Sequence, residues 1–259
     1  MKSQSEKAAG FRALHERARA FIIPNPWDIG TAKMLEALGF EALAGTSAGF
    51  AQSIGKIDGA VDRDTMLAHV AQLAAATDLP LSADLENGYA DKPAGVAETV
   101  RLAAAAGLSG CSIEDLPLGR DGEPYEIAFA AERIRAAAEA AHALPFTFTL
   151  TARAENFIAG HPDLADTIAR LQAFQEAGAD VLYAPGLRTK EDIATVVRSV
   201  DRPVNVLMGL QGVQLNLADL SALGVKRVSV GSALSRVAYN AALRAATEMR
   251  DHGTFTLLS

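Results

Sequence analysis

Two short apolar segments of this chain end in carboxylates. Residues 81–89 read Leu-Ser-Ala-Asp-Leu-Glu-Asn-Gly-Tyr and place Asp84 and Glu86 directly after a strand-like run. Residues 111–115 read Cys-Ser-Ile-Glu-Asp, so Glu114 follows a second such run. Carboxylates that meet at the tips of neighbouring strands repel one another unless a cation lies among them. Because carboxylate oxygens are ligands that hard divalent cations prefer, the spacing predicts a metal site.

The surrounding residue types favour Mg²⁺, with Mn²⁺ as a substitute, over Zn²⁺, since no cysteine or histidine clusters with these acids. Asp58 lies within a loop's reach of the same strand tips. For two other acids, Asp28 and Asp115, we expect structural roles as helix caps or in ion pairs. The candidate metal ligands are Asp84, Glu86, Glu114 and Asp58.

An arginine closes a third strand-like run. Residues 149–155 read Thr-Leu-Thr-Ala-Arg-Ala-Glu, which places the guanidinium of Arg153 beside the predicted carboxylates. Its fixed fork of donors suits a substrate carboxylate or phosphonate. Arg153 could also pair with Glu114 or Glu155, and the two roles are compatible.

Further segments offer places for a small anionic ligand. Residues 44–49 read Ala-Gly-Thr-Ser-Ala-Gly and supply backbone N–H groups and two hydroxyls that can cradle an anionic oxygen, although a tight strand-to-helix joint needs the same residues. Gly231 and Ser232 resemble the phosphate site common in barrel enzymes. Trp27 and Asn205 are additional substrate-binding candidates.

Several catalytic arrangements are missing from the pattern. No lysine ends a predicted strand, so a Schiff-base aldolase would lack its nucleophile. The sequence pattern does not indicate a Ser-His-Asp catalytic triad. Cys111 is the single cysteine, cannot form an internal disulfide, and lies inside a strand-like run, which favours a core position over a catalytic one.

The positioning elements follow a regular alternation of strands and helices. Apolar, β-branched or aromatic runs recur at 20–23, 42–44, 79–83, 110–113, 146–150, 180–183, 203–207 and 227–230. Segments with apolar residues at helical spacing lie between them, for example 30–38, 94–106, 128–141, 164–177 and 192–199. Eight such repeats in 259 residues predict one domain over residues 1–259, a parallel (β/α)8 TIM barrel whose last helix and tail cover about 233–259.

Glycines at the predicted helix ends support the count of eight strand-helix repeats. Helix-like segments end in a glycine just before the next strand at Gly39, Gly107, Gly178 and Gly224. An open doubly wound sheet is disfavoured because residues 24–28, Pro-Asn-Pro-Trp-Asp, replace the glycine fingerprint expected after its first strand. Irregular stretches at 52–64 and 116–125 follow predicted strands and are lid candidates.

Composition and charge argue against a nucleic-acid-binding, membrane or secreted protein. The chain has 24 Lys and Arg against 31 Asp and Glu and no basic run, which argues against a nucleic-acid partner. No apolar stretch approaches the roughly 20 residues of a membrane span, and the N-terminus leads into no apolar signal segment. We expect a cytoplasmic protein that acts on a small molecule.

The combined motifs resemble the isocitrate lyase and phosphoenolpyruvate mutase superfamily. Residues 83–89 are similar to its metal loop, Asp-Ala-Asp-Thr-Gly-Tyr-Gly, and residues 113–115, 153–160 and 177–180 extend the likeness, which runs from residue 24 to about 239. The resemblance implies a Mg²⁺-dependent carbon-carbon lyase or a related hydrolase that acts beside a 2-oxo acid through a pyruvate enolate. It also implies a homo-oligomer, dimer or tetramer, in which helix 233–250 is exchanged between subunits.

The resemblance assigns roles by position. Asp84 would bind Mg²⁺, while Glu86, Glu114 and Asp58 would hold it directly or through water. The substrate carboxylate would lie on Thr46, Ser47 and Ala48, and Arg153 would hold the second anionic group. The catalytic candidates are Arg153, Glu114 and Arg120, the last being the one cation of the 116–125 loop.

Two departures narrow the chemistry. The lyase branch's Lys-Lys-Cys-Gly-His loop is missing, and residues 116–122, Leu-Pro-Leu-Gly-Arg-Asp-Gly, replace the Lys- and Asn-bearing lid of the mutase branch. We therefore expect turnover of a small 2-oxo or 2-hydroxy acid such as oxaloacetate, with little turnover of isocitrate or phosphoenolpyruvate. The alternatives are a non-catalytic oxo-acid or anion-binding protein that kept the metal site, and an unrelated phosphosugar barrel enzyme using residues 231–232.

Overall fold

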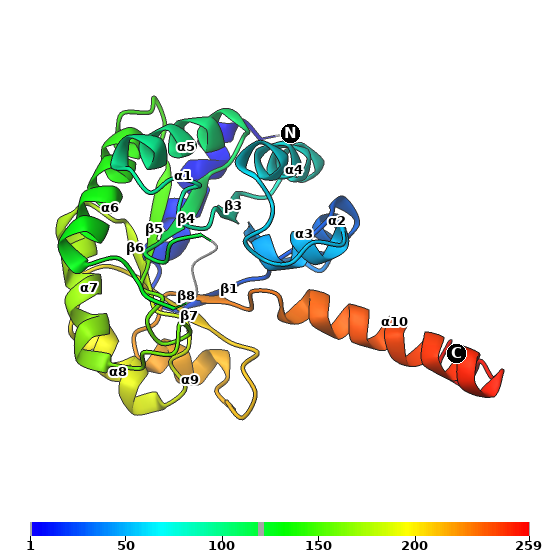
Figure 1. Cartoon of the computed structure of the whole chain (residues 1–259). Helices are drawn as coiled ribbons and strands as arrows, with labels where there is room; N and C mark the ends of the chain where they lie inside the picture. Colours follow the sequence, from blue (N-terminus) through cyan, green and yellow to red (C-terminus); the bar gives the residue numbers. More distant parts are fainter. Residues whose placement is uncertain (1, 119–121, 259) are drawn as a thin grey trace.

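The computed structural model of the chain describes residues 2–118 and 122–258 and shows a parallel barrel of eight strands (Figure 1). The strands are β1 (Phe21–Ile23), β2 (Leu43–Gly45), β3 (Leu81–Asp84), β4 (Gly110–Glu114), β5 (Thr149–Arg153), β6 (Val181–Tyr183), β7 (Val204–Leu207) and β8 (Arg227–Ser229). The predicted fold class is confirmed.

Helices surround the strands and connect them. They are α1 (Gln4–Glu16), α2 (Ile29–Ala37), α3 (Ser47–Ser53), α4 (Arg63–Ala76), α5 (Pro93–Ala105), α6 (Ile127–His142), α7 (Leu164–Glu176), α8 (Lys190–Arg198), α9 (Leu217–Ala222) and α10 (Ala233–His252), followed by the short 3-10 helix η1 (Thr256–Leu258). The four glycines predicted to end helices have positive φ angles between 85° and 103°, which glycine adopts without steric cost.

The sheet runs in the order β1-β8-β7-β6-β5-β4-β3-β2, so β1 and β2 meet where the ring closes. Two backbone hydrogen bonds bridge that seam, from Ala44 N to Pro24 O at 3.1 Å and from Thr46 N to Pro26 O at 3.3 Å. All neighbouring strands pair in parallel, for example β4 with β5. The carboxyl ends of all strands therefore open on one rim, as the argument for converging carboxylates requires.

The structure corrects the predicted irregular stretch at 52–64. Helix α3 continues to Ser53, and α4 begins at Arg63 behind Asp62, whose side chain accepts a hydrogen bond from Thr65 N. Only residues 54–62 form the connection. The predicted stretch is therefore two residues too long at each end, because the flanking helices extend into it, α4 behind a side-chain cap.

Helix α1 was not anticipated from the sequence. Its start carries a reciprocal cap between Ser3 and Glu6, and its buried face packs Phe11 and Leu14 against Phe21 of β1. The ring of Phe11 would lie 3.1 Å from a Cβ added at Gly110, the first residue of β4. Helix α1 thus covers the amino-terminal end of the barrel, opposite the rim of carboxylates.

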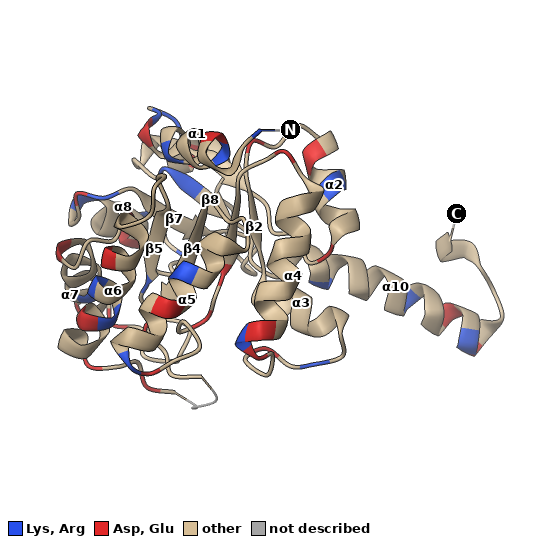
Figure 2. Ribbon diagram, turned by 90° about the horizontal axis from the view of Figure 1, so that it is seen from above, with Lys and Arg blue, Asp and Glu red and all other residues tan. Residues whose placement is uncertain are grey.

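Helix α10 projects away from the barrel (Figures 1 and 2). Along it Val237 is 67% exposed and Leu243 is 65% exposed, although they are apolar. Around the barrel itself, the positions of Lys and Arg along the ribbon are interspersed with those of Asp and Glu (Figure 2). No helix in the described part of the chain is long and apolar enough to cross a membrane.

A buried histidine under the barrel gives folding a defined pH dependence. His15 is 4% exposed, and its Nδ1 lies 2.9 Å from Phe11 O. Burial, reinforced by the positive charge of Arg227, lowers the pKa of His15 from the ordinary 6.5 to about 3. Between these two values the unfolded chain binds a proton that the folded chain does not, so this contribution favours unfolding as the pH falls through that interval.

We expect His15→Gln to remove this contribution. At pH 5 the proton uptake by unfolded His15 costs about 2 kcal/mol of folding free energy, and above pH 7 it costs nothing. Urea unfolding of wild type and variant at both pH values measures it. Because carboxyl groups titrate in the same interval, the informative quantity is the difference between the two proteins, and a pH-independent difference would contradict the assignment.

Candidate active site

Three charged side chains come from the carboxyl ends of adjacent strands. Asp84 ends β3, Glu114 ends β4 and Arg153 ends β5, with Glu114 directly opposite Arg153 in the ladder. Arg153 Nη1 lies 2.6 Å from Asp84 Oδ2, and its Nη2 lies 3.3 Å from Glu114 Oε2. Its Nε lies 2.8 Å from Glu155 Oε1. The guanidinium is thus the centre of the predicted cluster, and its expected pairing with Glu114 and Glu155 is confirmed.

The loop after β3 is held in an uncommon backbone conformation. Glu86 and Tyr89 have φ angles of 51° and 55°, in the left-handed region that non-glycine residues rarely adopt. Arg133 of α6 is fully buried beneath this loop and donates hydrogen bonds to the carbonyl oxygens of Asn87, Ala90, Asp91 and Glu114. Such strain persists only where the surroundings over-determine it, and it concentrates at functional sites.

Negative charge exceeds positive charge around Arg153. Burial, together with the charges of Asp84 and Asp58, raises the pKa of Glu86 to about 8. Burial also raises the pKa of Glu114 well above its usual range, against the opposing effect of Arg153. Burial at the cavity wall and the charge of Asp84 also raise the pKa of Asp58. A cation placed among these carboxyl groups would favour their ionised forms.

The donor set fits a hard cation, although its members are not drawn together into a closed cage. Within the described residues, no group of three or more His, Cys, Asp or Glu side chains is arranged to hold a metal ion. Mg²⁺ usually keeps several of its waters and is held by one or two carboxylates. Asp84 and Asp58 line the cavity described next, so direct coordination by Asp84 with water-mediated contacts to other carboxylates is compatible with this geometry.

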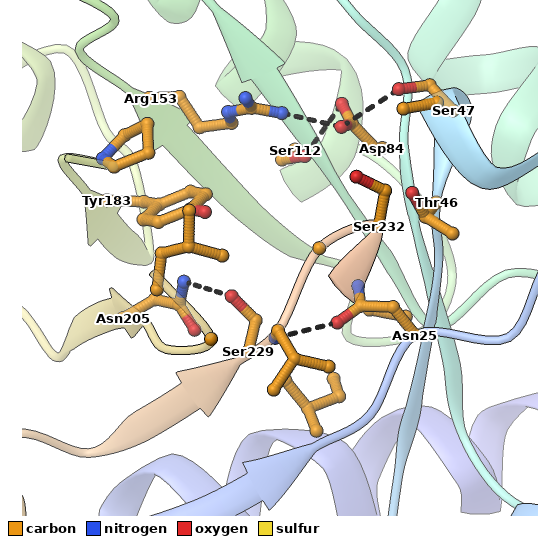
Figure 3. A pocket seen from close by; sticks show the side chains of 18 of the residues that line it. Asn25, Thr46, Ser47, Asp84, Ser112, Arg153, Tyr183, Asn205, Ser229 and Ser232 are labelled. Atoms are coloured by element: carbon orange, nitrogen blue, oxygen red, sulfur yellow. Dashed lines mark hydrogen bonds and ion pairs between the residues drawn. The ribbon is translucent and has the colours of Figure 1, made fainter. Parts of the chain in front are cut away.

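A cavity of about 180 Å³ opens beside the cluster, inside the rim of the barrel (Figure 3). It brings together most of the predicted substrate-binding residues, namely Thr46, Ser47, Ala48, Arg153 and Asn205. Ser47 Oγ lies 3.2 Å from Asp84 Oδ2, which connects the small-residue turn with the carboxylate cluster. The cavity is small, so it suits an acid of a few carbon atoms better than an extended ligand.

Comparison with known proteins shows the family of the chain. A model of the phosphoenolpyruvate phosphomutase family matches residues 11–250. The chain belongs to this family. The family lies within the isocitrate lyase and phosphoenolpyruvate mutase superfamily that the motifs resemble, so the predicted membership is confirmed.

Individual relatives of this phosphomutase-family member cover most of its length. An uncharacterised protein of Mycobacterium tuberculosis is 36% identical over 91% of the chain and 85% of its own length. The oxaloacetate decarboxylase of Paraburkholderia xenovorans is 30% identical over 86% of the chain and 74% of its own length. Both alignments include the three strand ends described above.

Solved structures show the same fold in other phosphomutase-family relatives. A candidate lyase/mutase from Burkholderia cenocepacia is 62% identical with a TM-score of 0.95, and the match covers 98% of this chain and 91% of that one. A phosphonopyruvate hydrolase in complex with oxalate and Mg²⁺ is 27% identical with a TM-score of 0.86, covering 96% and 89% of the two chains.

Trp27 is a predicted substrate-binding residue that the structure places away from the cavity. Trp27 is buried and does not line the cavity; its Cβ would lie 3.1 Å from a Cβ added at Gly49 in α3, so it packs behind the small-residue turn. Arg120 lies outside the described residues. Its predicted action on a bound anion therefore stays a prediction.

The two acids expected to be structural are confirmed in those roles. Asp28 caps α2 and accepts a hydrogen bond from Thr31 N at 2.7 Å. Asp115 accepts one from Glu155 N at 2.8 Å and pairs with Arg170 Nη1 at 3.1 Å. Both carboxylates thus stabilise the fold of this family member, Asp28 as a helix cap and Asp115 in an ion pair.

Sequence reasoning missed polar residues that line the interior of the cavity. They are Asn25, Ser112, Tyr183, Arg227 and Ser229, while Gly231 and Ser232, which the sequence did single out, also line the cavity. Tyr183 stands out because its ring lies 5.2 Å from Arg153 Cζ. A signal was present, since a tyrosine, a serine or an arginine inside an otherwise apolar strand run is a candidate for a polar interior position.

Proposed function

We propose that this phosphomutase-family protein is a cytoplasmic, Mg²⁺-dependent enzyme that cleaves a carbon-carbon bond of a small 2-oxo acid, with oxaloacetate as the reference substrate. The observation that carries the proposal is the position of Asp84, which lines a small cavity between the hydroxyl of Ser47 and the guanidinium of Arg153. A carboxylate for a cation and a fork for an anion thus face the same space.

The chain's own groups have separable tasks in this proposal. The turn at Thr46, Ser47 and Ala48 would bind the substrate carboxylate through backbone N–H groups and hydroxyls. Arg153 would orient the second anionic group by parallel hydrogen bonds. When bound at Asp84, Mg²⁺ would supply Lewis-acid stabilisation of negative charge on the oxo oxygen. The cavity walls exclude bulk water, which strengthens each of these interactions.

Relatives support this reaction class. A family relative that is 30% identical is an oxaloacetate decarboxylase, and another family structure holds oxalate and Mg²⁺. Oxalate resembles the planar enolate of pyruvate, so a site that binds both is suited to an enolate intermediate. Since Arg153 and Asp84 of this chain are close in space, the same ligand pair can be accommodated here.

A substrate panel tests the proposal. With Mg²⁺ present, we expect pyruvate release from oxaloacetate above the rate caused by the metal alone, and little glyoxylate from isocitrate or phosphoenolpyruvate from phosphonopyruvate. Rapid turnover of either of the last two would refute the interpretation of residues 116–122. Tight oxalate binding without any turnover would instead favour the non-catalytic binding protein, and phosphate bound only at residues 231–232 would favour the phosphosugar enzyme.

We propose further that α10 packs against a second copy of this chain. An amphipathic helix that projects from its own barrel leaves apolar side chains in water unless a partner covers them. Besides Val237 and Leu243, the exposed apolar residues of this region are Leu234, Tyr239, Met249, Phe255, Leu257 and Leu258. A symmetric partner can both receive α10 and supply its own.

Light scattering at micromolar concentration should therefore report a dimer or tetramer. The double variant Val237→Glu, Leu243→Glu should shift the mass toward the monomer, because it places charges in an apolar contact. Leu38→Glu, at a residue that is 69% exposed at the end of α2, is the matched control and should leave the mass unchanged. A monomeric wild-type protein would refute the exchange.

A further inference from the structure

A chain of hydrogen bonds joins β8 and β7 at the interior wall of the cavity. It begins at Arg227, which is 5% exposed. Within residues 2–118 and 122–258, Arg227 forms no ion pair with a carboxylate. Its Nε donates to Asn205 Oδ1 at 2.9 Å, and its Nη2 donates to Thr151 Oγ1 at 3.0 Å.

The charge of Arg227 fixes the direction of every following bond. A guanidinium can only donate, so the atom of Asn205 that faces it must be the amide oxygen. Asn205 Nδ2 then donates to Ser229 Oγ at 2.9 Å (Figure 3). Because the Ser229 oxygen accepts this bond, its own proton is free to be donated onward.

The next group is the hydroxyl of Tyr183. Burial raises the pKa of Tyr183 to about 12, against the opposing effects of Arg153 and Ser229, so the hydroxyl is protonated at neutral pH. Figure 3 shows the Tyr183 ring directed into the cavity beside Arg153. Among the described residues, no acceptor takes up the Tyr183 proton.

The direction of the chain therefore leaves one donor that faces a ligand. Arg227 donates to Asn205 and Asn205 donates to Ser229, so the Ser229 proton can be given to the oxygen of Tyr183, and the proton of Tyr183 remains for a molecule in the cavity. Arg153 lies 5.2 Å from the Tyr183 ring, so an anionic ligand held by that guanidinium would lie next to this hydroxyl. The positive charges of Arg153 and Arg227 also stabilise the tyrosinate that forms after proton loss.

We propose that Tyr183 is the catalytic acid that protonates the enolate, and that Arg227, Asn205 and Ser229 are positioning residues that aim its proton. This inference rests on the proposed function. As the C3–C4 bond of oxaloacetate breaks, its electron pair forms the enolate and carbon dioxide leaves. The enolate carbon then takes the proton of Tyr183 Oη, which gives pyruvate and tyrosinate, and a water molecule returns a proton to Tyr183.

The test isolates proton transfer from bond cleavage. Exchange of the methyl protons of pyruvate in D2O with Mg²⁺ present, followed by NMR, requires only enolisation and its reversal. We expect Tyr183→Phe to slow this exchange about 100-fold, the lower part of the range for general acid-base groups. Its oxalate affinity should stay within about twofold of wild type, because oxalate accepts no proton.

Two further variants test whether the orientation of the Tyr183 hydroxyl, and not a general disturbance of the fold, controls the exchange rate. Ser229→Ala should slow exchange by a smaller factor, since it removes a cavity hydroxyl that can donate to the Tyr183 oxygen while the Tyr183 proton is kept. Thr195→Val removes a hydroxyl on α8, outside the cavity, and should exchange at the wild-type rate. If Tyr183→Phe exchanges at the wild-type rate, or loses oxalate binding to the same extent as exchange, the acid role is refuted.

The outcome for wild type distinguishes the two proposals. Wild-type exchange without cleavage of any acid in the panel would refute the carbon-carbon lyase while the comparison with Tyr183→Phe still decides the inference. Cleavage with a fully active Tyr183→Phe would refute the inference alone. A wild-type protein that neither cleaves nor exchanges would refute both.

Discussion

Replacing Arg153 by alanine should abolish turnover of oxaloacetate and also destabilise the fold. The guanidinium is 9% exposed and touches Asp84, Glu114 and Glu155 at 2.6–3.3 Å. Removing one partner of a buried ion pair leaves uncompensated charge and costs about 3–5 kcal/mol. We expect the lower part of that range, because the carboxyl groups can take up protons instead. Urea unfolding and kcat/KM measure the two effects.

Two companion variants make this result specific. Arg153→Lys keeps a positive charge without the planar fork, so it should recover much of the stability while turnover stays at least about 100-fold below wild type. Arg101→Ala removes an exposed arginine of α5 that pairs with Glu98 at 3.2 Å, and it should change neither quantity. Full activity in Arg153→Lys would show that charge alone, and not bidentate geometry, is needed.

Asp84→Ala should cause a large loss of oxalate binding but, unlike Arg153→Ala, only a small loss of folding stability. In calorimetry with Mg²⁺ present, the affinity for oxalate should fall at least about 100-fold, which corresponds to about 2.7 kcal/mol. The fold should tolerate the change because Arg153 keeps Glu114 and Glu155 as partners. Removing Asp84 also removes a charge that raises the pKa of Glu86.

The control for this variant is Asp64→Ala, which removes a 90% exposed carboxylate of α4. It should bind oxalate as wild type does. Unchanged oxalate affinity in Asp84→Ala would remove the basis of the metal assignment. A loss of several kcal/mol in its unfolding free energy would show that Asp84 is held for the fold rather than for function.

The sequence was sufficient for the architecture and for the charged rim. Strand ends are recognisable where an apolar run stops at a carboxylate or an arginine, and Asp84, Glu114 and Arg153 lie at the ends of β3, β4 and β5 as expected. Parallel strands must place their carboxyl ends at one rim, so spacing along the chain was enough to predict proximity in space.

The polar interior of the barrel could be predicted only in part, for a physical reason. Parallel strands are buried on both faces and show no alternation of polar and apolar residues, so the sequence does not indicate which side chains point inward. Tyr183 and Arg227 were therefore not recognised as neighbours. Helix α1 was not predicted for a related reason. Its short apolar face becomes apparent only when the amino-terminal end of the barrel is present to pack against it.

The central claim is that this cavity catalyses metal-dependent cleavage of a small 2-oxo acid. Its most direct test is the rate of pyruvate release from oxaloacetate with Mg²⁺, after treatment with EDTA, and after Mg²⁺ is restored, each corrected for the reaction without protein. We predict release above background with Mg²⁺, loss with EDTA and recovery on readdition. Release that survives chelation, or no release above the metal-only rate, would contradict the account.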